Sequence, residues 1–133
     1  MTLPDAARRR ERAAFRVAVF VLSAVPIAAG SAGVVLGAGF ASLADGPGTP
    51  DADSHFRYLS GLLLGIGIAF PTTVAGRKVQ SARFRLLALI VILGGLARLL
   101  SAVTVGLPGP AHQAALVMEL GVTPALALWS LRL

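Results

Sequence analysis

Hydrophobic residues occur in four long runs that are separated by short polar stretches. The first two runs carry no charge, from Val17 to Ala44 and from Tyr58 to Gly76, whereas Arg98 interrupts the third run and Glu119 the fourth. About 20 consecutive apolar residues cross a bilayer as a helix, and continuous runs lack the alternation of a membrane β-barrel. The pattern predicts an all-α protein, a four-helix transmembrane bundle forming a single membrane domain over residues 1–133, with spans at about 17–40, 57–76, 86–106 and 111–131.

The composition supports this interpretation. Hydrophobic residues make up 56% of the 133 residues, only 14% are charged, and the mean hydropathy is +0.79. Soluble domains carry roughly 25% charged residues, and a soluble domain of this length could not bury so much apolar surface. The excess apolar surface is therefore expected to face lipid. The chain has no cysteine, so disulfides and thiol chemistry are excluded.

Basic residues lie on one side of the predicted spans. They precede the first span, join the second to the third and follow the fourth: Arg8, Arg9, Arg10, Arg12, Arg16, Arg77, Lys78, Arg83, Arg85 and Arg132. The positive-inside rule then predicts a multi-pass protein of the bacterial cytoplasmic (inner) membrane with both termini in the cytoplasm. The net charge of +6 is explained by this topology, so no nucleic-acid partner is expected.

The beginning of the chain has a second interpretation, because basic residues followed by an apolar stretch and small residues also describe a cleaved signal peptide. The length of the first run and the GxxxG spacing of Gly33 and Gly37 favour a retained span. Small residues allow membrane helices to approach closely, which makes glycines candidates for helix packing. The candidates are Gly33, Gly37, Gly61, Gly65, Gly94 and Gly95.

The stretch between the first two spans, residues 41–55, is predicted to be turn and coil because Gly46, Pro47, Gly48 and Pro50 interrupt it. Asp51 and Asp53 have the spacing of calcium ligands, but the positions that follow do not continue the motif. The stretch is therefore interpreted as a solvated acidic loop. No metal site and no cofactor are predicted anywhere in the chain.

The two charges inside apolar runs are the most informative residues. A charge near the middle of a bilayer costs about 2.5–3.5 kcal/mol on insertion scales, so it usually faces the protein interior with a partner. Counted from Leu86 at the cytoplasmic edge, Arg98 lies about 18 Å into a core of about 30 Å, which leaves about 12 Å to the outer edge. Counted from Ala111 at the outer edge, Glu119 also lies about 12 Å deep. Equal depth, opposite sign and antiparallel neighbouring helices predict a direct Arg98–Glu119 ion pair.

Polar and small residues share the helix faces of these charges. Ser101 is one turn from Arg98, while His112 and Thr123 share the face of Glu119. Arg57 adds a third charge at the outer end of the second span, with His55 nearby. Two arginines against one glutamate would make an outer-half pocket net positive, which suits a phosphate or carboxylate headgroup. The alternatives are a static pair that fixes helix register and an interfacial anchor at Arg57.

Three segments carry a resemblance to a known family. They are RYLSGLLLG at residues 57–65, GGLARLLS at residues 94–101, and the pair Glu119-Leu120. Over residues 54–129 the chain resembles the bacterial membrane proteins grouped as domain of unknown function 4345. The resemblance implies a four-helix inner-membrane protein, and it implies no established activity.

These observations favour a protein without catalytic residues that binds a lipid or small amphiphile, or that serves as a partner subunit for a second copy or another membrane protein. One alternative is a small proton-coupled transporter with Glu119 as the proton carrier, although small four-helix exporters usually place their acid in the first span. Another is a membrane-embedded enzyme of lipid or quinone metabolism. The shortage of nucleophiles and metal ligands argues against an enzyme.

Overall fold

The computed structural model describes residues 5–41 and 49–133, and every regular element within them is helical. The elements are α1 (Asp5–Leu36), α2 (Ala38–Ala41), α3 (Pro50–Thr72), α4 (Ser81–Thr104), α5 (Pro110–Val117), the π-helical turn η1 (Met118–Val122) and α6 (Thr123–Ser130). The last three follow one another without a break and form one helical segment, Pro110–Ser130. The prediction of an all-α protein is confirmed.

Three helical segments are long and apolar enough to cross a membrane: Asp5–Leu36, Ser81–Thr104 and Pro110–Ser130. They correspond to the first, third and fourth predicted spans. α3 has 23 residues, but its opening turns contain Asp51, Asp53, His55 and Arg57, which lower its hydropathy. The second span, at about 57–76, therefore stays a prediction.

α1 begins well before the apolar run, at Asp5 rather than near Val17. Alanine and arginine favour helix, and an aspartate in the first turn interacts favourably with the amino-terminal end of the helix dipole. The arginines that set the predicted topology, among them Arg8 and Arg12, therefore lie on a helix that continues into the apolar run.

The expectation of coil up to His55 is wrong, because α3 begins at Pro50. The side chain of Thr49 accepts a hydrogen bond of 3.2 Å from the main-chain N–H of Ala52 and caps the helix. Proline at the first helical position and acidic residues in the first turn are both favourable there. The rest of the predicted loop, residues 42–48 with Gly46, lies outside the described residues.

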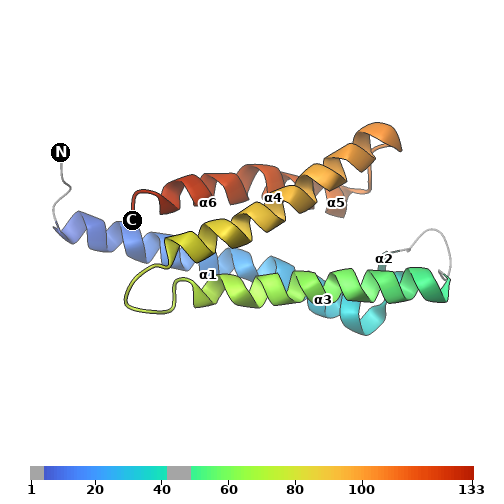
Figure 1. Ribbon diagram of the computed structural model, residues 1–133, viewed down its shortest axis with the longest axis horizontal. Helices are drawn as coiled ribbons and strands as arrows, with labels where there is room; N and C mark the ends of the chain where they lie inside the picture. Colours follow the sequence, from blue (N-terminus) through green and yellow to red (C-terminus); the bar gives the residue numbers. More distant parts are fainter. Residues whose placement is uncertain (1–4, 42–48) are drawn as a thin grey trace. The chain divides into compact units, whose positions relative to one another are not determined.

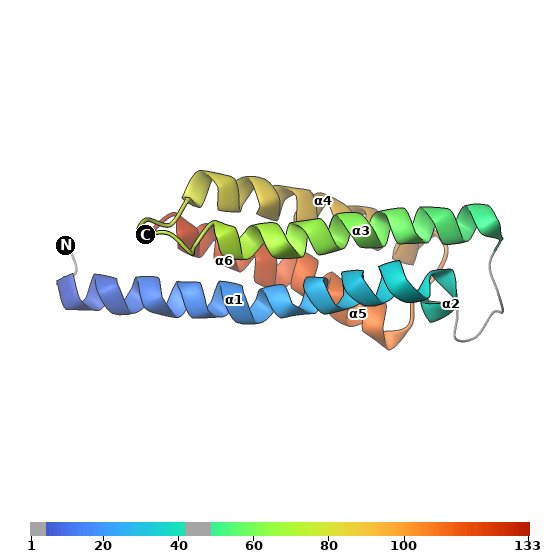
Figure 2. The same cartoon turned by 90° about the horizontal axis from the view of Figure 1, so that it is seen from below.

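The chain comprises two compact units, one formed by residues Arg16–Arg77 and the other by the stretch ending at Phe15 together with Lys78–Leu133. In the unit Arg16–Arg77, α1 and α3 run side by side (Figure 2). Gly30 of α1 approaches the backbone of Leu64 so closely that a Cβ on the glycine would lie 2.6 Å from the Leu64 nitrogen. Gly67 of α3 approaches Ile27 of α1 in the same way. Neither glycine is among those that the sequence predicts to pack helices together.

In the other unit, α4 lies beside α6 (Figure 1). The rings of Phe15, Phe84 and Trp129 meet edge to face, with the Phe15 centroid 5.1 Å from that of Phe84 and 5.4 Å from that of Trp129. The indole N–H of Trp129 donates to the carboxylate of Glu11 at 3.2 Å. Phe15 and Phe84 are fully buried, so this aromatic cluster anchors the opening of α1 to α4 and α6.

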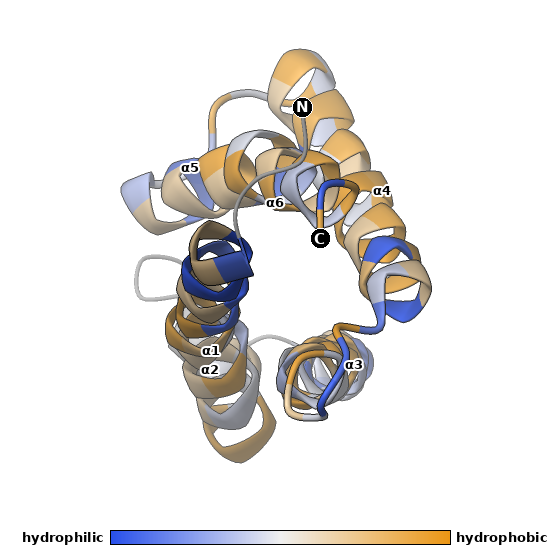
Figure 3. Ribbon diagram, turned by 90° about the vertical axis from the view of Figure 1, so that its left-hand side faces the viewer, coloured by the Kyte–Doolittle hydropathy of each residue, from blue (hydrophilic) through white to orange (hydrophobic). Residues whose placement is uncertain are grey.

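Far more large apolar side chains are exposed than are buried. Apolar residues cover the helices, and the opening of α1 is hydrophilic (Figure 3). On α4 the exposed side chains recur every three or four residues: Leu86, Leu89, Ile90, Leu93, Leu96, Leu100 and Val103. An exposed apolar face of this extent is typical of a membrane or interaction surface.

Candidate functional site

Arg98 of α4 and Glu119 of η1 form a two-point ion pair. The Nε of Arg98 donates to one carboxylate oxygen of Glu119 at 2.9 Å, and Nη2 donates to the other at 3.1 Å. This parallel arrangement is the strong, directional form of an arginine–carboxylate interaction. The side chains are 32% and 16% exposed respectively, so the guanidinium is the more accessible partner. The pair expected from depth and adjacency is present.

His112 of α5 completes the cluster. Nη1 of Arg98 lies 2.9 Å from Nδ1 of His112. A guanidinium only donates, so Nδ1 is the acceptor and the imidazole proton is on Nε2. We call Arg98, Glu119 and His112 the Arg98 cluster.

Gly95 makes the approach of Glu119 possible. A Cβ on Gly95 would lie 2.8 Å from the Cβ of Glu119 and 2.9 Å from Cδ2 of Leu120. Only a residue without a side chain fits at this contact, so Gly95 brings the backbone of η1 against α4 one turn before Arg98. Gly94 has no neighbouring atom within 4 Å among the described residues.

Glu119 lies in a π-helical turn with a local cause. Pro124 has no N–H, which leaves the carbonyl four residues earlier without its usual donor. The N–H and the hydroxyl of Thr123 both donate to the carbonyl of Met118, five residues back, with the hydroxyl at 2.9 Å. A π turn adds a residue to one helical turn and is frequent at functional sites. The sequence predicts Thr123 in the pocket, whereas its hydroxyl donates to the carbonyl of Met118 in its own helix.

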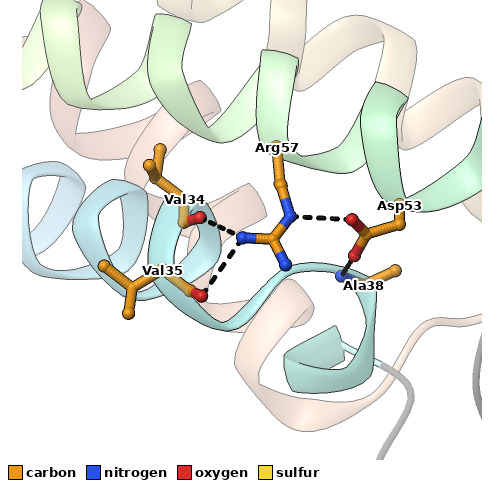
Figure 4. A network of polar contacts seen from close by, with 5 residues as sticks. All are labelled: Val34, Val35, Ala38, Asp53 and Arg57. Carbon is orange, nitrogen blue, oxygen red and sulfur yellow. Dashed lines mark hydrogen bonds and ion pairs between the residues drawn. The ribbon is translucent and has the colours of Figure 1, made fainter. Parts of the chain in front are cut away.

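Arg57 belongs to a different network, in the unit Arg16–Arg77 (Figure 4). Its Nε donates to the carboxylate of Asp53 at 2.7 Å, and its Nη1 donates to the carbonyls of Val34 and Val35 at 2.6 and 3.1 Å. These carbonyls are among the last of α1, where no main-chain donor follows within the helix. The other carboxylate oxygen of Asp53 accepts the N–H of Ala38 at 2.8 Å, at the start of α2. We call these residues the Arg57 clamp.

Two features show that the Arg57 clamp fixes the end of α1. Gly37 has φ +69°, a left-handed conformation that favours glycine, and a Cβ there would collide with the side chains of Asp53 and Arg57. The hydrogen bond from Arg57, followed by that from the N–H of Ala38, holds the pKa of Asp53 below its ordinary value of 3.8. The carboxylate is thus charged and engaged on both sides.

The predicted pocket therefore needs correction. Arg57 has its own carboxylate partner, so the assumption of two arginines against one glutamate is wrong. His55 and Ser101 are exposed, and neither side chain makes a hydrogen bond within the described part of the chain. Whether any of these residues binds a ligand stays a prediction.

Of the six glycines predicted to pack helices together, three make close contacts and three do not. Gly33, Gly37 and Gly95 lie against neighbouring side chains. Gly61 has only Val34 at 4.0 Å, and Gly65, like Gly94, has no neighbour within 4 Å among the described residues. Gly30 of α1 and Gly67 of α3, which were not predicted, also make close packing contacts between these helices. Within the same residues there is no group of three or more histidine, aspartate and glutamate side chains that could hold a metal ion.

Comparison with protein families gives a match over residues 14–130 to the family described as a domain of unknown function, DUF4345. The chain belongs to this family. Both the Arg57 clamp and the Arg98 cluster lie inside the DUF4345 match, whereas Arg8 and Arg12 lie outside it. No curated protein and no solved structure matches the chain.

Proposed function

We propose that this DUF4345 protein is a four-span protein of the bacterial cytoplasmic membrane that binds a lipid or small amphiphile through the Arg98 cluster. The observation that carries the proposal is the accessible guanidinium of Arg98. It is held by two side chains inside otherwise apolar helices, and it remains about one third exposed. An intramembrane charge with a fixed geometry is a candidate functional site.

The topology is supported by the two ends of the α1–α3 pair. At one end Arg57 binds the last carbonyls of α1, and at the other Arg16 donates to the carbonyls of Gly76 and Arg77 at 2.8 and 3.0 Å. Arg16 and Gly37 are 21 residues apart on α1 and its extension, which corresponds to about 31 Å along a helix. This is close to the hydrocarbon thickness of about 30 Å. Each arginine would thus lie near one interface, and α3 would span despite its polar opening.

The chemistry of the Arg98 cluster suits a headgroup with acceptor oxygens. A guanidinium has five N–H groups. Three are used by Glu119 and His112, which leaves two on Arg98, and Nε2 of His112 offers another. The carboxylate of Glu119 offsets the charge of the Arg98 guanidinium, so attraction of an anion is weaker than the sequence suggested. Phosphate, carboxylate or carbonyl oxygens would bind through hydrogen bonds.

The apolar part of such a ligand has a surface available beside the cluster. Leu96 and Leu100 of α4 flank Arg98 in sequence and are 49% and 64% exposed. An acyl chain lying along this face would exchange lipid contacts for protein contacts with little hydrophobic gain, so the headgroup contacts at Arg98 would determine the affinity. A headgroup at Arg98 with a chain on α4 is the arrangement that we expect for an amphiphile.

A mutant cycle with lipid analysis tests the binding function. Glu119→Gln and Arg98→Leu should each lower the melting temperature in detergent, because each leaves a partner without its countercharge. The double variant should cost less than the sum of the two. Mass spectrometry of co-purified lipids should show that the ligand is lost from the double variant although stability partly recovers. If the double variant retains the ligand, the pair is only structural and the proposed function is refuted.

The topology has its own test. Reporters fused after Leu133 and inserted near Lys78 should report the cytoplasm, and a reporter near Thr49 should report the periplasm. A periplasmic carboxyl terminus would contradict four spans. Intact-mass analysis of the membrane-purified protein tests whether the first span is retained. The measured mass should include the residues before Gly30, because the span is not cleaved as a signal peptide.

A further inference from the structure

A small cavity lies at the opposite end of α4 from the Arg98 cluster. It has a volume of about 180 Å³ and is lined by Arg12, Lys78, Val79 and Leu133. All four residues belong to the unit that contains α4. Nη2 of Arg12 donates to the main-chain oxygen of Leu133 at 3.1 Å, which fixes the guanidinium at the cavity. Two cations from distant parts of the sequence thus meet beside two apolar side chains.

No side-chain carboxylate neutralises the charge at this cavity. Neither Arg12 nor Lys78 lies within ion-pair distance of an aspartate or glutamate in the described part of the chain. Glu11, which is adjacent to Arg12 in sequence, accepts a hydrogen bond from Trp129. Arg8 and Arg9 lie one turn earlier on the face of Arg12 and add positive charge.

The depth of the cavity fits a lipid headgroup. Arg12 precedes the apolar run at Val17 by five residues, which corresponds to about 7.5 Å along α1. The interfacial layers outside the hydrocarbon core are of this order, since a core of about 30 Å lies within a bilayer of about 40–45 Å. A phosphate of the adjacent leaflet would therefore lie at the level of Arg12.

We propose that the cavity binds the phosphate group of an anionic phospholipid, with Arg12 and Lys78 on the phosphate oxygens and Val79 and Leu133 against the apolar part next to it. A volume of about 180 Å³ is smaller than the roughly 300–1,000 Å³ of pockets for drug-sized ligands, so it fits a headgroup and not a whole lipid. The positive-inside rule explains basic residues at this end, but not their meeting at a cavity with apolar walls. Because Ser81 and Arg98 are 17 residues apart, about 26 Å, the site is separate from the Arg98 cluster.

Native mass spectrometry of the full chain in detergent tests this site. We expect one phosphatidylglycerol molecule to bind in preference to phosphatidylcholine, which has the same phosphate but no net charge, and in preference to inorganic phosphate. A basic residue near anionic lipid contributes about five-fold in affinity. Arg12→Gln with Lys78→Gln should therefore weaken phosphatidylglycerol binding about 25-fold. The matched control, Arg10→Gln with Arg83→Gln, removes two charges outside the cavity and should change binding less than two-fold.

Three results would overturn the proposal: an equal loss in the control, equal binding of phosphatidylcholine, or inorganic phosphate binding as tightly as phosphatidylglycerol. If the double variant does not fold, Lys78→Gln alone is decisive, because Lys78 makes no side-chain hydrogen bond in the described residues. It should weaken binding about five-fold, and unchanged binding would refute the site. Loss of phosphatidylglycerol binding in Arg98→Lys, with unchanged binding in Lys78→Gln, would assign the bound lipid to the Arg98 cluster and overturn the cavity site, which separates the two proposals.

Discussion

The Arg57 clamp and the Arg98 cluster each contain one arginine and one carboxylate, but they differ in what else the arginine binds. Arg57 pairs with a residue four positions earlier on its own helix and then binds main-chain carbonyls at the end of α1. Arg98 pairs with a residue on a different helix and then binds a second side chain, His112. The first arrangement completes the hydrogen bonding of a helix end. The second joins the guanidinium, carboxylate and imidazole groups of three side chains, all of which can bind a ligand.

Charge alone therefore does not identify a functional arginine. Both arginines have one carboxylate partner, and both lie next to apolar segments. The acceptors distinguish them, because a carbonyl at a helix end needs a donor for stability, whereas His112 is exposed and could bind water in place of Arg98. The following predictions test this distinction.

The largest difference should appear when each carboxylate is neutralised. Glu119→Gln removes the countercharge of Arg98 from a part-buried pair between two helices, and the loss of stability should approach the roughly 3 kcal/mol found for buried pairs in soluble proteins. Asp53→Asn leaves Arg57 at an exposed helix end, where ion pairs contribute little, so the loss of stability should be clearly smaller. Thermal unfolding of both variants in one detergent measures the two shifts. Equal shifts would remove the distinction between the two networks.

Adding a methyl group to each of two neighbouring glycines should show whether the tight contact at Gly95 matters for stability. Gly95→Ala forces a Cβ against Glu119 and Leu120, and overpacking of this kind costs about 1–3 kcal/mol. Gly94→Ala adds the same atom at a position with open space and should be neutral or slightly stabilising, since alanine favours helix. Thermal unfolding checks both variants. A large loss at Gly94 would mean that another surface packs against that face.

The smallest effect should be the pH dependence of the Arg57 clamp. Because the folded-state pKa of Asp53 is depressed, its contribution to stability is present above the ordinary value of 3.8 and is lost as the pH falls through the folded-state pKa. The difference in melting temperature between the wild type and Asp53→Asn should be constant at pH 5 and above and shrink below about pH 4. A difference that grows on acidification would contradict the assigned bonds.

The sequence predicted the Arg98–Glu119 pair because depth and sign depend only on position along a helix. It did not predict the Arg57 clamp, although Asp53 and Arg57 have the four-residue spacing of an ion pair on a helix. Pro50 is as compatible with a loop as with the first residue of a helix, and in a loop the four-residue spacing does not predict an ion pair. The carbonyls of Val34 and Val35 could not be predicted, because their approach to Arg57 depends on the register between α1 and α3.

The glycine spacings also predicted some contacts correctly and others incorrectly. A GxxxG pattern marks a face with small side chains, but it does not say which neighbouring helix covers that face. Gly33 contacts Ser60, whereas Gly65 faces open space among the described residues. Pro124 predicts that the helix around Glu119 is distorted, but it does not specify that the distortion is a π turn.

The most direct test of the account compares two conservative substitutions. Lysine retains the charge of arginine but not its planar, two-point geometry. Arg98→Lys and Arg57→Lys would be purified from the same membranes, adjusted to equal folded fractions by thermal analysis, and examined by mass spectrometry for bound lipid or amphiphile. The account predicts that Arg98→Lys loses the ligand that the wild type carries, while Arg57→Lys retains it. Loss of the ligand from Arg57→Lys, with retention by Arg98→Lys, would contradict the assignment of the Arg98 cluster as the binding site.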